Sequence, residues 1–186
     1  MRRLIDVLLS IFFLLILLPI IIFTAIIIKF DSKGPIFFIS NRVGKNNENF
    51  KMIKFRTMYL NTEIIETSKL KNASLKTTKI GKILRKLSID EIPQFFNVLI
   101  GNMSIVGPRP AIPGQINLIR NRKKFGIDKI KPGITGYAQI NGRDLISDKK
   151  KIKLEIQYIK KQGFFVDLII ILKTFKVVFN KIGVLH

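Results

Sequence analysis

The sequence predicts an α+β fold that is mostly helical, with a hydrophobic segment near its amino terminus that enters the membrane. Three observations carry this prediction. Residues 7–28 are almost entirely apolar, residues 36–58 contain two β-type runs around a turn, and the stretches after residue 79 repeat apolar side chains at helical spacing between lysines and arginines. We expect a re-entrant membrane-anchoring helix over residues 1–30 and a cytoplasmic domain over residues 31–186, with amphipathic helices on the membrane surface.

The composition points to an anionic partner. The chain has 33 Lys and Arg against 12 Asp and Glu, a formal net charge of +21, and yet 47% of its 186 residues are hydrophobic. This combination favours an anionic membrane surface over nucleic acid, because each basic residue near such a surface contributes about 1 kcal/mol. The chain has no cysteine, and its single histidine is His186. A thiolate metal site and a Ser/His/Asp triad are therefore not expected.

The apolar segment is long enough for the roughly 20 residues that a spanning helix needs. Its flanks conflict with a simple span, because Arg2 and Arg3 before it and the basic remainder after it all favour the cytoplasm. Pro19 removes a backbone hydrogen bond in the middle of the run and leaves two arms, each too short to cross a core of about 30 Å. A re-entrant segment resolves the conflict, and a spanning helix that tolerates proline is the alternative.

A β-hairpin is expected next. The runs 36–39 and 50–58 flank the turn-rich residues 44–47. In the second strand Lys54 and Arg56 fall on one face, because side chains alternate along a strand. Two adjacent cations suit phosphate binding, and a solvated face is the alternative.

Residues 61–78 are polar and predict a surface loop with one short helix, and a basic amphipathic helix follows, with apolar positions at Ile80, Ile83, Leu84 and Leu87. Ser88 then precedes Glu91 by three residues, which is the pattern of a capping box. This pattern places Asp90 and Glu91 in the first turn of a new helix.

The acid pair and a nearby arginine form the principal candidate site. Arg109 lies in Gly107-Pro108-Arg109-Pro110, where the prolines favour a stiff, extended backbone. An arginine held in this way can bind an anion opposite two carboxylates. The alternative is that the acids only favour a helix start through its dipole and that the prolines form a surface turn.

The remaining stretches are a glycine-rich run and two helices. Residues 131–143 carry lysine and arginine at their ends and suit either an anion cradle or a structural turn. Residues 149–161 and 164–179 are expected as helices on or against the membrane surface, since Asp167, Lys173 and Lys176 interrupt the second too often for a span. Two ordinary core helices are the alternative.

Four motifs, in this order, resemble those of the bacterial sugar transferase family, the monotopic polyprenyl-phosphate phosphoglycosyl transferases, in their minimal small form. They are KFRTM at 54–58, RKLSIDE at 85–91, GNMSIVGPRP at 101–110 and KPGITG at 131–136. The resemblance implies transfer of a sugar 1-phosphate from a UDP-sugar to undecaprenyl phosphate, giving undecaprenyl-diphosphate-sugar and UMP. It further implies the initiating step of bacterial glycan assembly, at the cytoplasmic face of the inner membrane.

The resemblance also implies roles for individual residues. Asp90 is expected to attack the sugar-bearing phosphate and form a phosphoaspartyl intermediate, and Glu91 and Asp90 to hold Mg²⁺. Lys54, Arg85 and Arg109 are expected to bind the substrate phosphates. Oxygen-ligated magnesium also suits a chain without cysteine.

Four positions depart from the family pattern, among them Asn102, where aspartate is frequent, and Tyr137, where tryptophan or leucine is common. Leu18 precedes Pro19 where a small hydroxyl residue is usual, and Glu155 stands where aspartate is usual, as a candidate for assisting the metal or the substrate.

The competing hypothesis is a membrane-attached basic protein that recruits nucleic acid or acidic lipid without chemistry. It explains the charge and leaves the acid pair without a role, so we expect the membrane and not nucleic acid as partner. Motifs that handle phosphate and metal do not specify the sugar, the glycan pathway or the oligomeric state.

Overall fold

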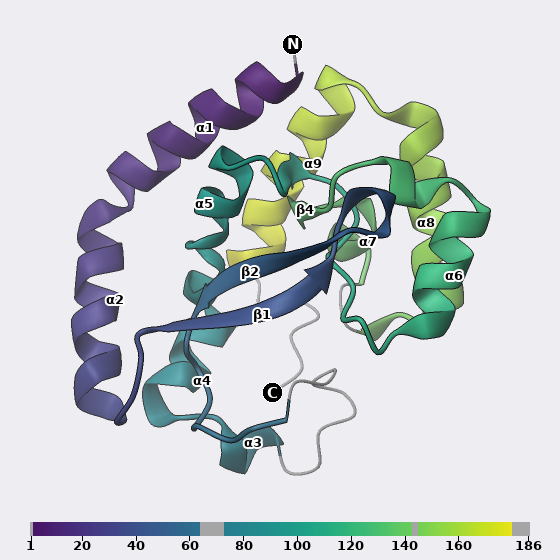
Figure 1. Cartoon of the computed structure of the whole chain (residues 1–186). Coiled ribbons are helices and arrows are strands. Elements are labelled where there is room, and N and C mark those ends of the chain that lie inside the picture. The colour runs from purple at the N-terminus through teal and green to yellow at the C-terminus, as the bar shows by residue number, and fades with distance from the viewer. Residues whose placement is uncertain (1, 64–72, 143–144, 180–186) are drawn as a thin grey trace.

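Two apolar helices run along one side of the protein and meet at a bend (Figure 1). The structure is a computed structural model that describes residues 2–63, 73–142 and 145–179. Helix α1 spans Arg2–Ile16, α2 spans Leu18–Asp31, and the pair is bent by 61°. Pro19 lies in the first turn of α2, where a missing N–H leaves no hydrogen bond unmade. The predicted break is confirmed. Within the described ranges no single helix is long and apolar enough to cross a membrane; only the bent pair together meets that requirement.

The predicted hairpin crosses the middle of the molecule (Figure 1). Strands β1 (Phe37–Val43) and β2 (Asn49–Phe55) pair antiparallel around a short 3₁₀ turn, η1 (Lys45–Asn47). Asn46 and Asn47 have φ angles of 55° and 62°, a conformation that asparagine tolerates well. The hairpin is confirmed, although its first strand extends four residues beyond the predicted end at Ile39.

The chain then forms four short helical elements. They are α3 (Ala73–Lys76), α4 (Lys79–Lys86), the 3₁₀ turn η3 (Ile89–Glu91) and α5 (Gln94–Leu99). Of these, α4 contacts α2 and α5 contacts α1. The predicted amphipathic helix is α4, whose first turn is capped by the Thr78 side chain accepting from the N–H of Gly81. Its Leu84 is buried with Ile28 of α2 and Phe55 of β2. The short helix expected between residues 61 and 78 is α3, while residues 64–72 of that stretch lie outside the described residues.

A parallel strand pair that the sequence did not predict joins the second half of the chain. Strand β3 (Ser104–Val106) pairs with β4 (Gly133–Thr135), and between them lie α6 (Ile116–Lys124) and η4 (Ile127–Lys129). The glycines of the glycine-rich run allow this approach. A Cβ atom on Gly133 would lie 2.1 Å from the nitrogen of Gly107, and one on Gly136 would lie 2.0 Å from the oxygen of Gly107. For these glycines the packing supports the alternative of a structural turn. Arg143, at the end of the run, lies outside the described residues.

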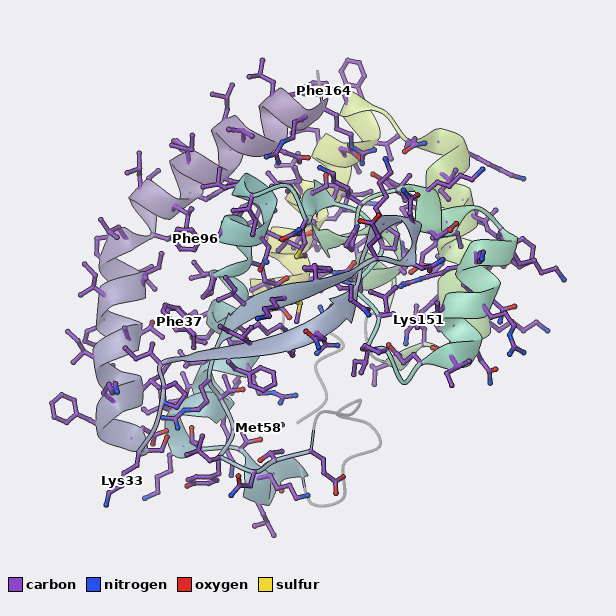
Figure 2. All side chains as sticks on the ribbon, in the orientation of Figure 1. Lys33, Phe37, Met58, Phe96, Lys151 and Phe164 are labelled. Carbon is purple, nitrogen blue, oxygen red and sulfur yellow. The ribbon has the colours of Figure 1, made fainter. Side chains whose placement is uncertain are left out.

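Three helices complete the fold: α7 (Tyr137–Ile140), α8 (Asp148–Lys161) and α9 (Phe164–Phe179). Tyr158 of α8 and Ile170 of α9 are buried in the largest core cluster with Val98 of α5. The outer side of α9 is apolar and exposed, with Phe164 projecting away from the protein (Figure 2). Helix α8 is therefore a core helix on one face, whereas α9 keeps the unpartnered apolar surface expected of a helix at a membrane.

The amino-terminal end of the bent pair is fixed to the rest of the domain. Arg2 forms an ion pair with Asp167 at 3.1 Å, donates to the carbonyl of Val106 at 3.1 Å, and contacts the hydroxyl of Tyr158. Arg3 donates to the carbonyl oxygen of Leu99, near the end of α5, at 2.6 Å. The two arginines that suggested a cytoplasmic amino terminus are therefore also structural ties.

The carboxyl-terminal end of the pair is fixed by the hairpin. Arg56 is buried and donates to the carbonyl oxygens of Ser32 at 2.7 Å and Lys33 at 2.5 Å, just after α2. Lys54 donates to Glu91 instead, so the two cations have different protein partners, and their binding of phosphate stays a prediction. The carbonyl oxygens exposed after the end of α2 provide the acceptors that attract Arg56.

Candidate active site

The acid pair lies in a 3₁₀ turn and not at the start of an α-helix. Asp90 and Glu91 belong to η3 and are each 8% exposed. The predicted capping box is wrong, because Ser88 adopts a left-handed conformation (φ 56°, ψ 20°) and its side chain makes no capping hydrogen bond. The left-handed residue reverses the chain directly after α4, and the Glu91 carboxylate is directed toward the hairpin.

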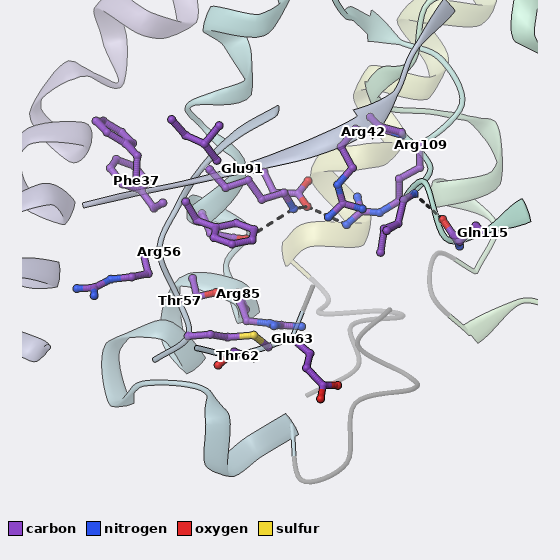
Figure 3. A pocket seen from close by; sticks show the side chains of 18 of the residues that line it. Phe37, Arg42, Arg56, Thr57, Thr62, Glu63, Arg85, Glu91, Arg109 and Gln115 are labelled. Carbon is purple, nitrogen blue, oxygen red and sulfur yellow. Dashed lines mark hydrogen bonds and ion pairs between the residues drawn. The ribbon is translucent and has the colours of Figure 1, made fainter. Parts of the chain in front are cut away.

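Glu91 is held by two cations from different elements (Figure 3). Its Oε1 atom accepts from Lys54 Nζ at 2.7 Å and from Arg109 Nη2 at 3.0 Å. Lys54 also lies 3.9 Å from Asp90 Oδ2. The hairpin, η3 and the loop after β3 thus converge on one carboxylate oxygen, which fixes the geometry of the acid pair.

All five residues expected at the site line one cavity of about 610 Å³. Arg85, at the end of α4, is close enough to lower the pKa of Asp90, as Lys54 and Arg109 also do. The cavity continues past these residues to Gln115, Lys151 and other side chains of the carboxyl-terminal half. The volume is within the range of pockets for ligands of drug or cofactor size.

Burial has the largest effect on the ionisation of Asp90. It raises the pKa of Asp90, with a smaller contribution from the neighbouring Glu91 carboxylate, while Lys54 is the strongest opposing influence. Burial also lowers the pKa of Lys54, and the charge of Glu91 opposes that change most. Perturbed titratable groups that share a cavity are typical of catalytic sites.

Sequence reasoning missed one cation of this cavity, Arg42. The hairpin register pairs Arg42 with Phe50 and Phe38 with Lys54, so Arg42 and Lys54 project from the same face of the sheet. Burial and the nearby Arg109 lower the pKa of Arg42 to about 10, and Glu91 opposes them. Sequence reasoning missed Arg42 because the first strand was expected to end at Ile39, which left Arg42 outside both predicted strands.

Glu155 has a different environment from the one expected. It is 3% exposed and receives two bonds from Arg122, Nε to Oε2 at 2.9 Å and Nη2 to Oε1 at 2.5 Å. Arg122 also donates from Nη1 to the carbonyl oxygen of Arg109 at 2.9 Å. The Glu155 carboxylate, a candidate for assisting the metal or the substrate, lines the same cavity, binds Arg122 and supports the Arg109 backbone through it.

The acid pair has the donor chemistry that Mg²⁺ requires. No group of three or more His, Cys, Asp or Glu side chains gathers anywhere in residues 2–63, 73–142 and 145–179, so an all-protein metal cage is absent from these ranges. Mg²⁺ is usually bound through one or two carboxylates together with substrate phosphates and water. Asp90 and Glu91 fit this pattern.

Adjacent carboxylates that share one cavity with several cations are typical of sites for phosphate chemistry. The profile of a family described as bacterial sugar transferase matches residues 1–181. The chain belongs to this family.

Characterised and uncharacterised relatives agree with this assignment. The chain is 36% identical to the UDP-N-acetylgalactosamine-undecaprenyl-phosphate N-acetylgalactosaminephosphotransferase of Aeromonas hydrophila, over 98% of this chain and 44% of that protein. It is 40% identical to the uncharacterized sugar transferase EpsL of Bacillus subtilis, over 99% of this chain and 90% of that protein. It is 36% identical to the UDP-glucose:undecaprenyl-phosphate glucose-1-phosphate transferase of Escherichia coli, over 97% of this chain and 41% of that protein. The chain thus spans less than half of the length of the first and third relatives.

Proposed function

We propose that this protein transfers a sugar 1-phosphate from a UDP-sugar to undecaprenyl phosphate, giving undecaprenyl-diphosphate-sugar and UMP. The observation that carries the proposal is the buried acid pair, with Glu91 held by Lys54 and Arg109 in a cavity that Arg85 also lines. The names of the Aeromonas and Escherichia relatives support the same reaction class and these two substrates.

In the proposed first step, the ionised carboxylate of Asp90 attacks the sugar-bearing phosphorus of the UDP-sugar. A bond forms between a carboxylate oxygen and phosphorus, and the bond from phosphorus to the bridging oxygen breaks. UMP leaves with that oxygen, and a phosphoaspartyl intermediate remains. Cations fixed before the reaction stabilise the charge that develops on the phosphate oxygens, which is the main contribution that a protein makes to phosphoryl transfer.

In the second step, an oxygen of undecaprenyl phosphate attacks the same phosphorus, and the Asp90 carboxylate is released. Glu91 does not need to move, since its two ion pairs position it beside Asp90 throughout. Glu91 and Asp90 would hold Mg²⁺, which would supply positive charge to neutralise the diphosphate. The raised pKa of Asp90 suits a nucleophile, because a more basic carboxylate attacks faster once it is ionised.

The proposed site of action is the cytoplasmic face of the bacterial inner membrane, with α1 and α2 as a re-entrant anchor. Arg2 and Arg56 fasten the two ends of the bent pair to the same folded domain. A segment whose ends share one domain enters and leaves the membrane on one side. The anchor would hold the cavity near the head groups, where the phosphate of the lipid acceptor lies.

UMP release tests this function. The purified protein in nanodiscs, with Mg²⁺ and undecaprenyl phosphate, is expected to release UMP from at least one member of a panel of UDP-sugars. Asp90→Asn is expected to release none, whereas the matched variant Asp128→Asn, in η4 on another part of the surface, keeps wild-type activity. Full activity in Asp90→Asn would remove the nucleophile assignment, and no turnover of any UDP-sugar by the wild type would contradict the proposed function.

A further inference from the structure

Cations outnumber carboxylates around the acid pair. Lys54, Arg85 and Arg109 all act on the charge of Asp90, and Arg42 lies close enough to Glu91 and Arg109 for its own pKa to respond to both. Four cations therefore surround two carboxylates. Partly buried like charges repel one another, so this arrangement favours the entry of a ligand with several negative charges.

Arg42 differs from the other arginines of the cavity wall in how its donors are used. Arg56 and Arg122 also line the cavity, but the first donates to carbonyl oxygens after α2 and the second to Glu155 and the Arg109 carbonyl. Across the described residues, Arg42 makes a single hydrogen bond, from Nε to Ser40 Oγ at 3.3 Å, and no ion pair. Its two terminal NH₂ groups thus have no protein acceptor within that part of the chain.

The position of Arg42 separates it from the attacked phosphate. The hairpin register places Arg42 opposite Phe50, four residues along β2 from Lys54, which corresponds to about 13 Å of strand. Arg42 instead lies beside Arg109 and Glu91 (Figure 3). Arg42 therefore lines the cavity from a position on the hairpin apart from that of Lys54, whose ammonium pairs with both Asp90 and Glu91.

We propose that Arg42 binds a second phosphate group, one that Asp90 does not attack, through its two terminal NH₂ groups. The planar guanidinium can bind a phosphate in a bidentate manner. Two substrates could supply this phosphate: the uridine-bearing phosphate of the UDP-sugar, which leaves as UMP, or the phosphate of undecaprenyl phosphate. The assignment rests on the proposed function, because it takes these substrates from it.

The test compares Arg42→Gln and Arg42→Lys with Lys51→Gln. Lys51 is an exposed cation on the same hairpin and is not part of the cavity lining, so its variant removes the same charge without touching the site. For each protein in nanodiscs, the KM of the UDP-sugar that the wild type uses best and the KM of undecaprenyl phosphate are measured. Binding of UDP is measured separately by calorimetry, without turnover.

We expect Arg42→Gln to weaken the interaction with one substrate by about 10- to 100-fold, the usual effect of losing a hydrogen bond between charged groups. Arg42→Lys should show a smaller loss, because it keeps the charge and loses the bidentate geometry. Lys51→Gln should match the wild type. A higher KM for the UDP-sugar together with weaker UDP binding identifies the uridine-bearing phosphate, and a higher KM for undecaprenyl phosphate alone identifies the lipid phosphate.

Unchanged values of both KM and of UDP binding in Arg42→Gln, relative to Lys51→Gln, would overturn the assignment while the enzyme remained active. A wild-type protein that uses no UDP-sugar would contradict the proposed function instead, so the two failures are distinguishable. Thermal unfolding is recorded for each variant. If Arg42→Gln does not fold, the same comparison of Arg42→Lys with Lys51→Gln decides: wild-type values in Arg42→Lys overturn the proposal.

Discussion

A single carboxylate oxygen, Glu91 Oε1, connects three separate elements of this protein. It accepts from Lys54 of the hairpin and from Arg109 of the loop after β3, at 2.7 and 3.0 Å. Behind Arg109, Arg122 binds both the carbonyl oxygen of that residue and the carboxylate of Glu155. The acid pair is therefore positioned by a chain of charged contacts that extends from β2 to α8.

The first prediction concerns the far end of this chain of contacts. Glu155→Ala removes the partner of the buried Arg122 guanidinium, and the free energy of unfolding should fall by about 3–5 kcal/mol, because an uncompensated charge remains buried. Thermal or denaturant unfolding of the protein in detergent measures this change. Asp148→Ala, at the exposed start of the same helix, is the control and should cost about 1 kcal/mol or less.

The double variant Glu155→Leu/Arg122→Leu distinguishes the cause. If the loss in Glu155→Ala comes from an unpaired charge, removing both partners should restore much of the stability. A double variant as unstable as Glu155→Ala would show that the charge is not the cause. A Glu155→Ala protein with wild-type stability would contradict the role given to the ion pair.

Sequence patterns anticipated some of these residues for a clear reason. Local motifs contain five of the site residues, so the resemblance to the family identifies each of them: Asp90, Glu91, Lys54, Arg85 and Arg109. Arg42 depends on where a strand ends, and the contact of Arg122 with Glu155 joins residues 33 positions apart. The prediction of a capping box was wrong because a Ser-x-x-Glu pattern does not determine the backbone conformation of Ser88. Contacts between elements that are distant in the sequence cannot be predicted from the spacing of residues within a short motif.

At the scale of elements, the fold depends on close contact between the strand pair β3–β4 and its following loops. Gly107, Gly133 and Gly136 bring backbone atoms to distances that no Cβ atom would permit. This contact joins the loop of Arg109 to the glycine-rich run, and it places α7 next to the cavity through Gln139. The sequence showed the glycines but not the strand pairing, because strands of three residues are too short to show periodicity.

The second prediction tests this packing. Gly136 has an extended backbone (φ −176°) that alanine adopts easily, so Gly136→Ala should act only through the Cβ clash with the Gly107 oxygen at 2.0 Å. We expect the free energy of unfolding to fall by about 1–3 kcal/mol, the usual cost of overpacking. Thermal unfolding provides the measurement.

Gly114→Ala is the matched control, because a Cβ atom at this position meets nothing within 4 Å. It should leave the midpoint of thermal unfolding unchanged or slightly higher, since alanine lowers the entropy of the unfolded chain. Equal stabilities of Gly114→Ala and Gly136→Ala would contradict the assigned packing of β3 against β4.

At the scale of the whole molecule, the bent helix pair and α9 concentrate exposed apolar side chains. Leu15 is 67% exposed, Phe30 is 89% exposed and Phe165 is 75% exposed. The sequence predicted the apolar surface of the bent pair, because a long apolar run and a proline in its middle are local signals. The ties made by Arg2 and Arg56 were invisible in the sequence, since both arginines contact residues distant in the chain.

The third prediction concerns topology. The chain has no cysteine, so single cysteines can be introduced cleanly, one ahead of Met1 and one as Lys45→Cys in the exposed hairpin turn. In membrane vesicles of known orientation, an impermeant maleimide should modify both from the cytoplasmic side, because both ends of the bent pair join one domain. Modification of the two cysteines from opposite sides would replace re-entry with a span.

In the proposed reaction, Asp90 carries the sugar phosphate between the two substrates. Intact-protein mass spectrometry detects this intermediate after incubation with Mg²⁺ and a UDP-sugar that the protein uses, without undecaprenyl phosphate. We expect a mass increase equal to one sugar phosphate, located by peptide mapping at Asp90, absent from Asp90→Asn and removed when undecaprenyl phosphate is added. Turnover with no adduct on a rapid-quench timescale, or an adduct on another residue, would contradict it.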